Sequence, residues 1–331
     1  MTRCAVIGAG AWGTALADLL ARNNHDVRIW AYEWDVVESI NRSHLNRRFL
    51  PGSPLYDTIE AFNDLGDALE GAELVTFATP SHVFRSIART TKECIRDGVP
   101  VIVASKGIEQ ETLALMTDVA AQELPQTTVI ALSGPSFAAE VIAQQPTAVV
   151  VASADPNAAL FAQQTFSSIH FRAYTHTDVT GVEIGGALKN VMAVATGIAE
   201  GLGLGFNARA ALITRGLAEM TRLGVKLGAE ATTLAGLAGM GDLVLTCTGS
   251  LSRNRAVGVE VGRGASLDKV LEGRDTVAEG VVTTRSAHAL AAREEVEMPI
   301  VHAVQKVLFE GQPARDAIGA LMARELRPES D

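Results

Sequence analysis

Short runs rich in Val, Ile and Ala alternate with segments of helical spacing through the first half of the chain. This alternation is typical of a mostly parallel β-sheet with helices on both faces. The apolar runs predict strands at 3–7, 27–30, 74–78, 101–104, 129–132, 148–152 and 169–174. The segments between them predict helices at 14–23, 34–42, 81–95, 112–123, 137–144 and 157–166.

The alternation stops near Gly181, and long Ala, Leu and Val-rich segments with helical spacing follow to the C-terminus. This half is predicted to be almost entirely helical. Asn207 is a candidate N-cap for a helix through Leu227 that ends at Gly228, and Pro299 marks another helix start. The predicted fold class is therefore α/β, with an N-terminal Rossmann-like, doubly wound, mostly parallel sheet followed by an all-helical C-terminal domain.

Composition and charge restrict the classes of function. The 331 residues are 47% hydrophobic, which suffices for a large core, and the net charge of −10 gives no broad attraction for nucleic acid or anionic membranes. Cys4, Cys94 and Cys247 lack C-x-x-C spacing, which predicts neither a disulfide framework nor a zinc site and favours a reducing cytosol. No run approaches the roughly eighteen apolar residues of a membrane helix, so a cytoplasmic protein without membrane insertion is expected.

A G-x-G-x-x-G pattern at residues 8–13 lies between the first predicted strand and the first predicted helix. In that context Gly8 permits the tight turn, Gly10 lets the backbone approach a pyrophosphate, and Gly13 lets the helix pack close to the strand. The helix N-terminus then faces the diphosphate. The pattern therefore predicts dinucleotide binding. The alternatives are a glycine-rich turn of another α/β protein or a secretory signal. Asp18 and three glycines interrupt the apolar stretch and argue against the signal.

No Pro/Ser-rich linker separates the two halves. We expect a direct strand-to-helix passage near 175–182, with an NAD(P)-binding Rossmann-like domain at 1–180 and a helical, substrate-binding and catalytic domain at 181–331. Domains joined in this way are expected to pack tightly around a ligand cleft.

Polar residues follow several predicted strands, where a Rossmann-like sheet binds its ligands. Thr79, Lys106 and the segment 133–138 all lie there. Lys106 is either a solvated loop lysine or a ligand-binding group, and its place after a central strand favours the second interpretation.

Lys189 is the only charged residue between Glu183 and Glu200, in an otherwise apolar helix. It must either extend its ammonium outward to water or lie in a polar pocket. In a pocket, burial and nearby cations would lower its pKa into the range of proton transfer near neutral pH.

The segment 250–255 places two guanidinium groups, hydroxyls and an amide before a predicted helix through Val261. Arg253, Ser252 and Asn254 would suit a phosphate at that helix start, although a solvated turn capped by Ser252 fits as well. Asp242 is either a simple N-cap or a partner of Lys189 or of a substrate hydroxyl.

Seven segments together resemble the bacterial-type NAD(P)-dependent glycerol-3-phosphate dehydrogenases. They are 8–17, 105–107, 132–138, 186–190, 207–216, 239–243 and 252–254. The resemblance implies hydride transfer between the nicotinamide C4 and the C2 carbon of a three-carbon phosphate, dihydroxyacetone phosphate or glycerol 3-phosphate. It also implies NAD or NADP as cofactor and a supply of glycerol 3-phosphate for phospholipid synthesis. Because the nicotinamide carries the hydride, no metal is expected, and the helical half favours a homodimer. The histidines, among them His82, His170 and His176, show no metal-ligand spacing.

The resemblance also implies residue roles. Lys189 would exchange a proton with the C2 oxygen, with Lys106 and Asp242 completing the catalytic group. The implied substrate-binding residues are Lys106, Gly134, Ser136, Lys189, Asp242, Ser252, Arg253 and Asn254. The cofactor-binding candidates are Gly8, Gly10, Ala11, Trp12, Gly13, Tyr32, Glu33, Lys106, Ala138, Arg253, Val277 and Glu279.

Cofactor preference depends on the segment after the second strand. Relatives often have a basic residue near Tyr32 that would meet a 2′-phosphate, and the segment 30–33 has none. Glu33, twenty residues beyond Gly13, lies about where an acid binds the ribose of NAD. We expect NADH to be used at least as readily as NADPH.

Two other functions remain open. A dehydrogenase of hydroxy acids with a helical second domain would share the first half, but its carboxylate substrate would not need the phosphate-binding segment 252–254. A non-catalytic redox sensor would bind the dinucleotide alone, and the presence of Lys189 with that segment disfavours it.

Overall fold

The computed structural model describes residues 1–273, 278–326 and 328–329. Its sheet has eight strands in the order β3-β2-β1-β4-β5-β6-β7-β8, and every neighbouring pair is parallel except β6 and β7. The strands are β1 (Arg3–Ile7), β2 (Asp26–Trp30), β3 (Glu60–Phe62), β4 (Leu74–Phe77), β5 (Pro100–Val103), β6 (Thr128–Ser133), β7 (Thr147–Ala152) and β8 (Phe171–His176). The mostly parallel sheet is confirmed, but β3 was not predicted, because three residues with an exposed Glu60 show no strand pattern.

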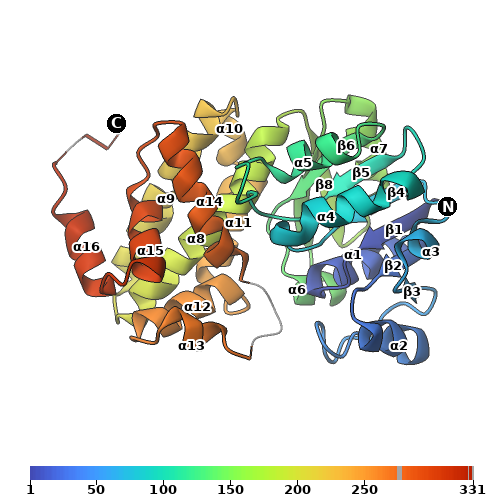
Figure 1. The fold of residues 1–331 in the computed structure, drawn as a ribbon, viewed down its shortest axis with the longest axis horizontal. Coiled ribbons are helices and arrows are strands. Elements are labelled where there is room, and N and C mark those ends of the chain that lie inside the picture. The colour runs from blue at the N-terminus through green and yellow to red at the C-terminus, as the bar shows by residue number, and fades with distance from the viewer. Residues whose placement is uncertain (274–277, 327, 330–331) are drawn as a thin grey trace.

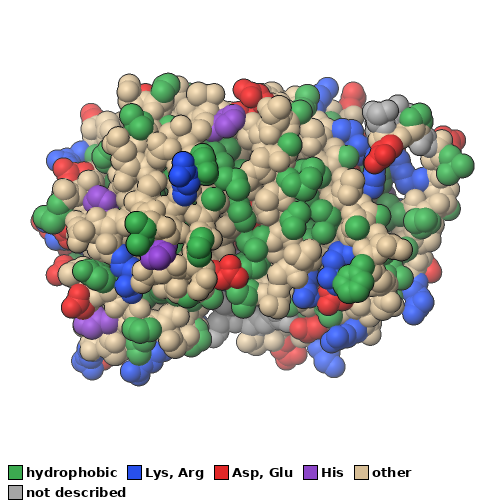
Figure 2. Space-filling view, turned by 180° about the vertical axis from the view of Figure 1, so that it is seen from behind, with side chains coloured by type: hydrophobic (Ala, Val, Ile, Leu, Met, Phe, Trp, Pro, Cys, Tyr) green, Lys and Arg blue, Asp and Glu red, His purple; other side chains and the backbone are tan. Residues whose placement is uncertain are grey.

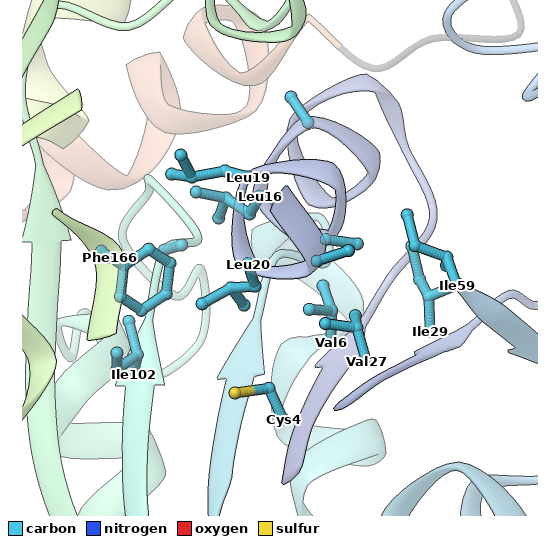
Figure 3. Packing of buried hydrophobic residues seen from close by; sticks show 14 of the residues in the cluster. Cys4, Val6, Leu16, Leu19, Leu20, Val27, Ile29, Ile59, Ile102 and Phe166 are labelled. Atoms are coloured by element: carbon cyan, nitrogen blue, oxygen red, sulfur yellow. The ribbon is translucent and has the colours of Figure 1, made fainter. Parts of the chain in front are cut away.

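Helices cover both faces of this sheet (Figure 1). One face packs against α1 (Ala11–Arg22), α2 (Trp34–Ser43), α6 (Ala138–Ile142) and α7 (Pro156–Phe166), and the other against α3 (Leu65–Leu69), α4 (Ser81–Thr91) and α5 (Met116–Glu123). Alternate residues of β1 enter the two cores, with Cys4 and Val6 on the α1 side and Ala5 and Ile7 on the other. Figure 3 shows the α1 side, where Leu20 lies beside Val6.

The second half is helical, as predicted, and lies beside the sheet in Figure 1. Its helices are α8 (Val179–Gly201), α9 (Phe206–Lys226), α10 (Ala231–Leu234), the π-helical turn η2 (Leu237–Gly241), α11 (Asp242–Thr248), α12 (Arg253–Gly262), α13 (Leu267–Leu271), α14 (Glu279–Arg293), α15 (Pro299–Phe309) and α16 (Ala314–Met322). The predicted N-cap at Asn207 is wrong. Gly205, with an extended backbone, is the N-cap of α9, and Asn207 already lies inside the helix.

Helix α8 is the centre of the helical half. Two stretches, Val179–Gly201 and Ala231–Thr248, have the length and apolar composition of a membrane span, which the sequence analysis did not expect. In the first, 94% of the apolar window is buried, and α8 packs against α9, α11, α12 and α14. The second is divided among α10, η2 and α11. The apolar character of α8 thus corresponds to a core helix inside the protein.

Glycines allow α8 and α12 to cross closely. A Cβ on Gly258 would lie 2.2 Å from the Val194 carbonyl oxygen, and one on Gly197 would lie 2.2 Å from that of Arg255. Only hydrogen at these positions permits the observed contact. The crossing therefore fixes the start of α12, with Arg253, against the middle of α8.

The chain passes from β8 to α8 through Asp178, which caps α8 by accepting a hydrogen bond from the Gly181 N–H at 2.7 Å. This direct passage lies where it was predicted. Because α8 also contacts β6 and β7, the division of the chain at residue 180 stays a prediction.

The face drawn in Figure 2 carries acidic and basic side chains interspersed with apolar ones. Among the described residues on this face, no extended basic patch is visible.

Candidate active site

The β1–α1 turn has the strand–turn–helix geometry that the glycine pattern predicts. Gly8 has φ +111°, and a Cβ on Gly13 would lie 1.8 Å from the Gly8 carbonyl oxygen, so both positions require glycine. A Cβ on Gly10 would meet nothing within 4 Å. The backbone at Gly10 is therefore open on the side from which a pyrophosphate would approach.

Three of the predicted cofactor contacts lie together beside this turn. Ala11 and Trp12 begin α1, Ala138 begins α6, and all three pack against the same core cluster. Two buried polar atoms nearby, Trp12 Nε1 and the Thr79 hydroxyl at the end of β4, have no hydrogen-bond partner in the described chain. Unpartnered buried polar atoms are rare, and a bound ligand would satisfy them.

Tyr32 and Glu33 follow β2, as predicted. Tyr32 is 78% exposed and its ring contacts Trp30 edge-on, and Glu33 is the N-cap position of α2 without a side-chain capping bond. Val277, another predicted cofactor contact, lies outside the described residues.

Two lysines share one buried carboxylate between the halves of the chain. Lys189 Nζ donates to Asp242 Oδ1 at 2.5 Å, and Lys106 Nζ donates to Asp242 Oδ2 at 2.7 Å. Lys189 also donates to the Thr246 hydroxyl at 3.0 Å, and Lys106 to the Gly134 carbonyl at 3.3 Å. Of the alternatives for Lys189, the polar pocket is therefore correct, and Asp242 is the partner of both lysines rather than an N-cap.

Burial sets the protonation of this group. It lowers the pKa of Lys189 to about 8, with Asp242 opposing the shift and Lys106 adding to it. Burial alone would raise the pKa of Asp242, but the two ammonium groups outweigh it and hold that pKa below its usual value. With a pKa of about 8, Lys189 can exchange its proton near neutral pH.

Local structure positions these side chains. Lys106 and Gly134 lie just after β5 and β6, at the carboxyl edge of the sheet, and Asp242 begins α11 directly after the π-helical turn η2. π-Helical turns occur frequently at functional sites. Ser136, half-buried, donates to the Gly134 carbonyl at 3.0 Å.

Residues 252–255 pack against α8, and each of them has a different role. Ser252 caps α12 by accepting from the Arg255 N–H at 3.2 Å, and Asn254 donates to Asn190 at 2.8 Å. Arg255, the second guanidinium of this segment, pairs with Glu200 at 3.1 Å and so holds α12 to the end of α8. Arg253 makes no hydrogen bond or ion pair with any described residue.

Glu279 joins the two halves at a second point. Its carboxylate accepts from the Ser81 N–H at 3.1 Å and from the Ser81 hydroxyl at 2.7 Å, at the start of α4. Burial raises the pKa of Glu279, and the Ser81 hydrogen bonds and the charge of Arg253 oppose the rise. The next residue, Gly280, donates its N–H to Asn254 Oδ1 at 2.9 Å, which brings Glu279 close to the start of α12.

Sequence reasoning missed Thr246 and Asn190. Thr246 lies one helical turn after Asp242 and contacts both Lys189 and Asp242, and Asn190 follows Lys189 and binds Asn254. The i, i+4 spacing was a usable signal for Thr246. Asn190 lies in the segment 186–190 that carries the family resemblance, but no local pattern indicated its hydrogen bond with Asn254.

The predicted ligand cleft stays a prediction. Two cavities, of about 810 Å³ at the beginnings of β7 and β8 and about 290 Å³ between α14 and α15, lie away from these residues. Within the described ranges, no group of three or more His, Cys, Asp or Glu residues is placed to hold a metal ion.

Two family models cover most of the chain. The N-terminal model of NAD-dependent glycerol-3-phosphate dehydrogenase matches residues 3–159, and its C-terminal model matches residues 178–319. A glycerol-3-phosphate dehydrogenase [NAD(P)+] of Geobacter sulfurreducens is 54% identical over 99% of this chain and 98% of its own length.

Solved structures agree. A glycerol-3-phosphate dehydrogenase from Coxiella burnetii has a TM-score of 0.94 and 40% identity, over 98% of this chain and 99% of that one. A ketopantoate reductase from Ralstonia eutropha has a TM-score of 0.63 and 16% identity, over 97% of this chain and 99% of that one. The second likeness shows the fold alone, so the fold by itself does not select the substrate.

Proposed function

The chain belongs to the NAD-dependent glycerol-3-phosphate dehydrogenase family, and we propose that Lys189 is the general acid and base of its reaction. The enzyme is an oxidoreductase that acts on a CH–OH group and uses NAD or NADP. The observation that carries the proposal is the buried Lys189, held by Asp242 at 2.5 Å, with a pKa of about 8.

The residues around the β1–α1 turn fit a dinucleotide. The open backbone at Gly10, the close packing of Gly13 and the unpartnered Trp12 Nε1 support pyrophosphate binding at the start of α1. When bound, the nicotinamide supplies or accepts the hydride. The proposed cofactor contacts are Gly8, Gly10, Ala11, Trp12, Gly13, Tyr32, Glu33, Lys106, Ala138, Arg253, Val277 and Glu279.

Arg253 is the proposed anchor of the substrate phosphate. Its guanidinium offers paired donors, and the N–H groups at the start of α12 add further ones. Ser252 and Asn254 support this site mainly by capping α12 and by fixing it to Asn190. Anchoring the remote phosphate orients the reacting carbon and lets binding energy contribute to catalysis.

The proton step is assigned to Lys189. In the reducing direction, the charged ammonium polarises the C2 carbonyl of dihydroxyacetone phosphate and gives its proton to that oxygen as C2 receives the hydride. Glycerol 3-phosphate forms, and neutral Lys189 regains a proton from water. In the oxidising direction, neutral Lys189 takes the hydroxyl proton. Asp242 holds Nζ in place throughout, and Lys106, with Gly134 and Ser136 beside it, adds positive potential for the substrate.

The test follows the loss of reduced-nicotinamide absorbance with dihydroxyacetone phosphate, using NADH and NADPH in parallel and unphosphorylated dihydroxyacetone as the control. We expect oxidation only with the phosphate ester. Lys189→Ala should lose about a thousandfold in kcat while still binding NADH, which is a typical cost for a general acid. A Lys189→Ala enzyme with full activity would remove Lys189 from the catalytic role.

We further propose that the protein works in the cytoplasm as a homodimer and supplies glycerol 3-phosphate for phospholipid synthesis, and that NADH serves at least as well as NADPH. Family membership supports the cytoplasmic site and the supply role, the helical second half supports the dimer, and the position of Glu33 supports the use of NADH. Light scattering tests the dimer, and glycerol auxotrophy of a deletion strain tests the supply role. A hundredfold preference for NADPH would contradict the last statement.

A further inference from the structure

The loop at residues 44–55 is pinned to the glycine-rich turn. Asn46, which is fully buried, donates from Nδ2 to the Ala9 carbonyl at 2.7 Å and to the Thr14 hydroxyl at 2.8 Å. Its Oδ1 accepts from the Phe49 N–H at 3.0 Å. One amide side chain thus ties both the turn and the loop into a fixed arrangement.

The same loop is also held by α2 and by its own ends. The Ser39 hydroxyl donates to the Leu45 carbonyl at 2.7 Å, and the Leu55 N–H donates to the His44 carbonyl at 2.8 Å. Leu45 and Pro54 form an isolated antiparallel bridge. Because the loop is anchored on both sides, the residues between its ends have defined positions beside the end of β2.

Arg48 lies in this loop and reaches α2. Its Nη1 is 3.5 Å from Asp35 Oδ1, in the first turn of α2, and its guanidinium lies over the Phe49 ring at 5.4 Å. Asp35 follows Glu33 by two residues. The fold therefore brings a guanidinium to the carboxyl end of β2, where a Rossmann-like domain places the adenosine ribose.

We propose that Arg48 binds the 2′-phosphate of NADPH and is the residue that admits NADPH as well as NADH. This inference rests on the cofactor site proposed above. The segment 30–33 carries no cation, and Arg48 supplies one from a later part of the sequence. A guanidinium matches phosphate geometry with paired N–H donors.

The ion pair between Arg48 and Asp35 is weak enough for the guanidinium to bind a phosphate. Its side chains are 35% and 65% exposed, and an ion pair of that kind stabilises a protein by less than about 1 kcal/mol. A 2′-phosphate carries up to two negative charges, and a guanidinium with five N–H donors can bind it without giving up the contact with Asp35. With NADH, Arg48 keeps Asp35 as its partner, so the same site accepts a free ribose hydroxyl.

The kinetic test compares Arg48→Ala with Arg42→Ala, a matched control that removes an exposed α2 arginine paired with Glu38. Arg48→Ala should lower kcat/KM for NADPH by about tenfold or more, as expected for loss of a charge-assisted hydrogen bond, and change the NADH value less than about twofold. Arg42→Ala should change neither. Equal losses with both cofactors, or no loss with NADPH, would overturn the assignment.

A binding measurement separates this inference from the proposed reaction. By calorimetry, 2′,5′-ADP should bind Arg48→Ala about tenfold more weakly than the unaltered protein, while 5′-ADP binding stays unchanged. This result would support Arg48 even if dihydroxyacetone phosphate were not reduced. If 2′,5′-ADP binds both proteins equally, Arg48 is not the phosphate ligand, whatever the substrate.

Discussion

Replacement of Asp242 by Asn tests how the carboxylate shared by two lysines controls proton transfer. The change removes the charge that opposes the lowered pKa of Lys189, and leaves burial and Lys106, which both lower that pKa further. Asp242 is fully buried, with oxygens 2.5 and 2.7 Å from the two Nζ atoms, so solvent screens the interaction little.

The magnitude follows from the geometry. Unit charges about 4 Å apart interact by about 4 kcal/mol at an effective dielectric constant of about 20. Since about 1.4 kcal/mol corresponds to one pKa unit, the pKa of Lys189 should fall by about 3 units from its value of about 8. At pH 7 only about one Lys189 in a hundred would then carry the proton for reduction.

We therefore expect Asp242→Asn to reduce dihydroxyacetone phosphate about a hundredfold more slowly at pH 7, with the alkaline limb of its pH profile moved to lower pH. Glycerol 3-phosphate oxidation at pH 7 should lose less, because that direction needs neutral Lys189. Both directions are measured from pH 5 to 9, with circular dichroism as the folding control and exposed Asp268→Asn as the matched variant. A folded Asp242→Asn enzyme whose limb stays near pH 8 would refute the reasoning.

Three further predictions concern phosphate binding, packing and pH. Arg253→Ala should raise KM for dihydroxyacetone phosphate ten- to a hundredfold in steady-state assays, because the phosphate loses its paired N–H donors. Gly258→Ala should lower the melting temperature by several degrees because its Cβ would lie 2.2 Å from a carbonyl oxygen, whereas Gly319→Ala, with nothing within 4 Å, should not lower it. Burial raises the pKa of Glu183 and of Glu219 to about 7, so the native state keeps protons that the unfolded chain releases above about pH 4.5. The free energy of unfolding should therefore fall by up to about 3 kcal/mol per site between pH 4.5 and 7. In denaturant unfolding, the double variant Glu183→Gln, Glu219→Gln should show a flatter pH dependence than the unaltered protein.

The features that were predicted correctly depend on local sequence. Strand periodicity, the glycine turn and the lone charge of Lys189 in an apolar helix each lie within a few residues, and the structure places all three as expected. β3 was missed because three residues carry too little pattern. Asn207 was a reasonable cap by residue type, but Gly205 allows the chain to enter α9 earlier.

Contacts between distant residues could not be predicted in this way. Ser81 and Glu279 are 198 positions apart, and Arg255 and Glu200 are 55 apart. Sequence periodicity does not indicate such pairs, since the first depends on how the helical half packs on the sheet and the second on how α12 packs on α8 within the helical half. The separate roles of the adjacent Arg253 and Arg255 therefore became visible only in the folded chain.

The hydrogen bonds that join the two halves include the group proposed for catalysis. Lys106 of the sheet half meets Asp242 of the helical half at 2.7 Å, and Thr117 at the start of α5 donates its N–H to Glu183 of α8 at 3.0 Å. Any separation of the halves would remove Lys106 from Asp242 and admit water to Lys189. Both changes would raise the pKa of Lys189, since burial and Lys106 are what lower it. Lys189 therefore has a pKa suited to proton transfer near neutral pH only while the two halves are packed together, and the interface that builds the site also adjusts its chemistry.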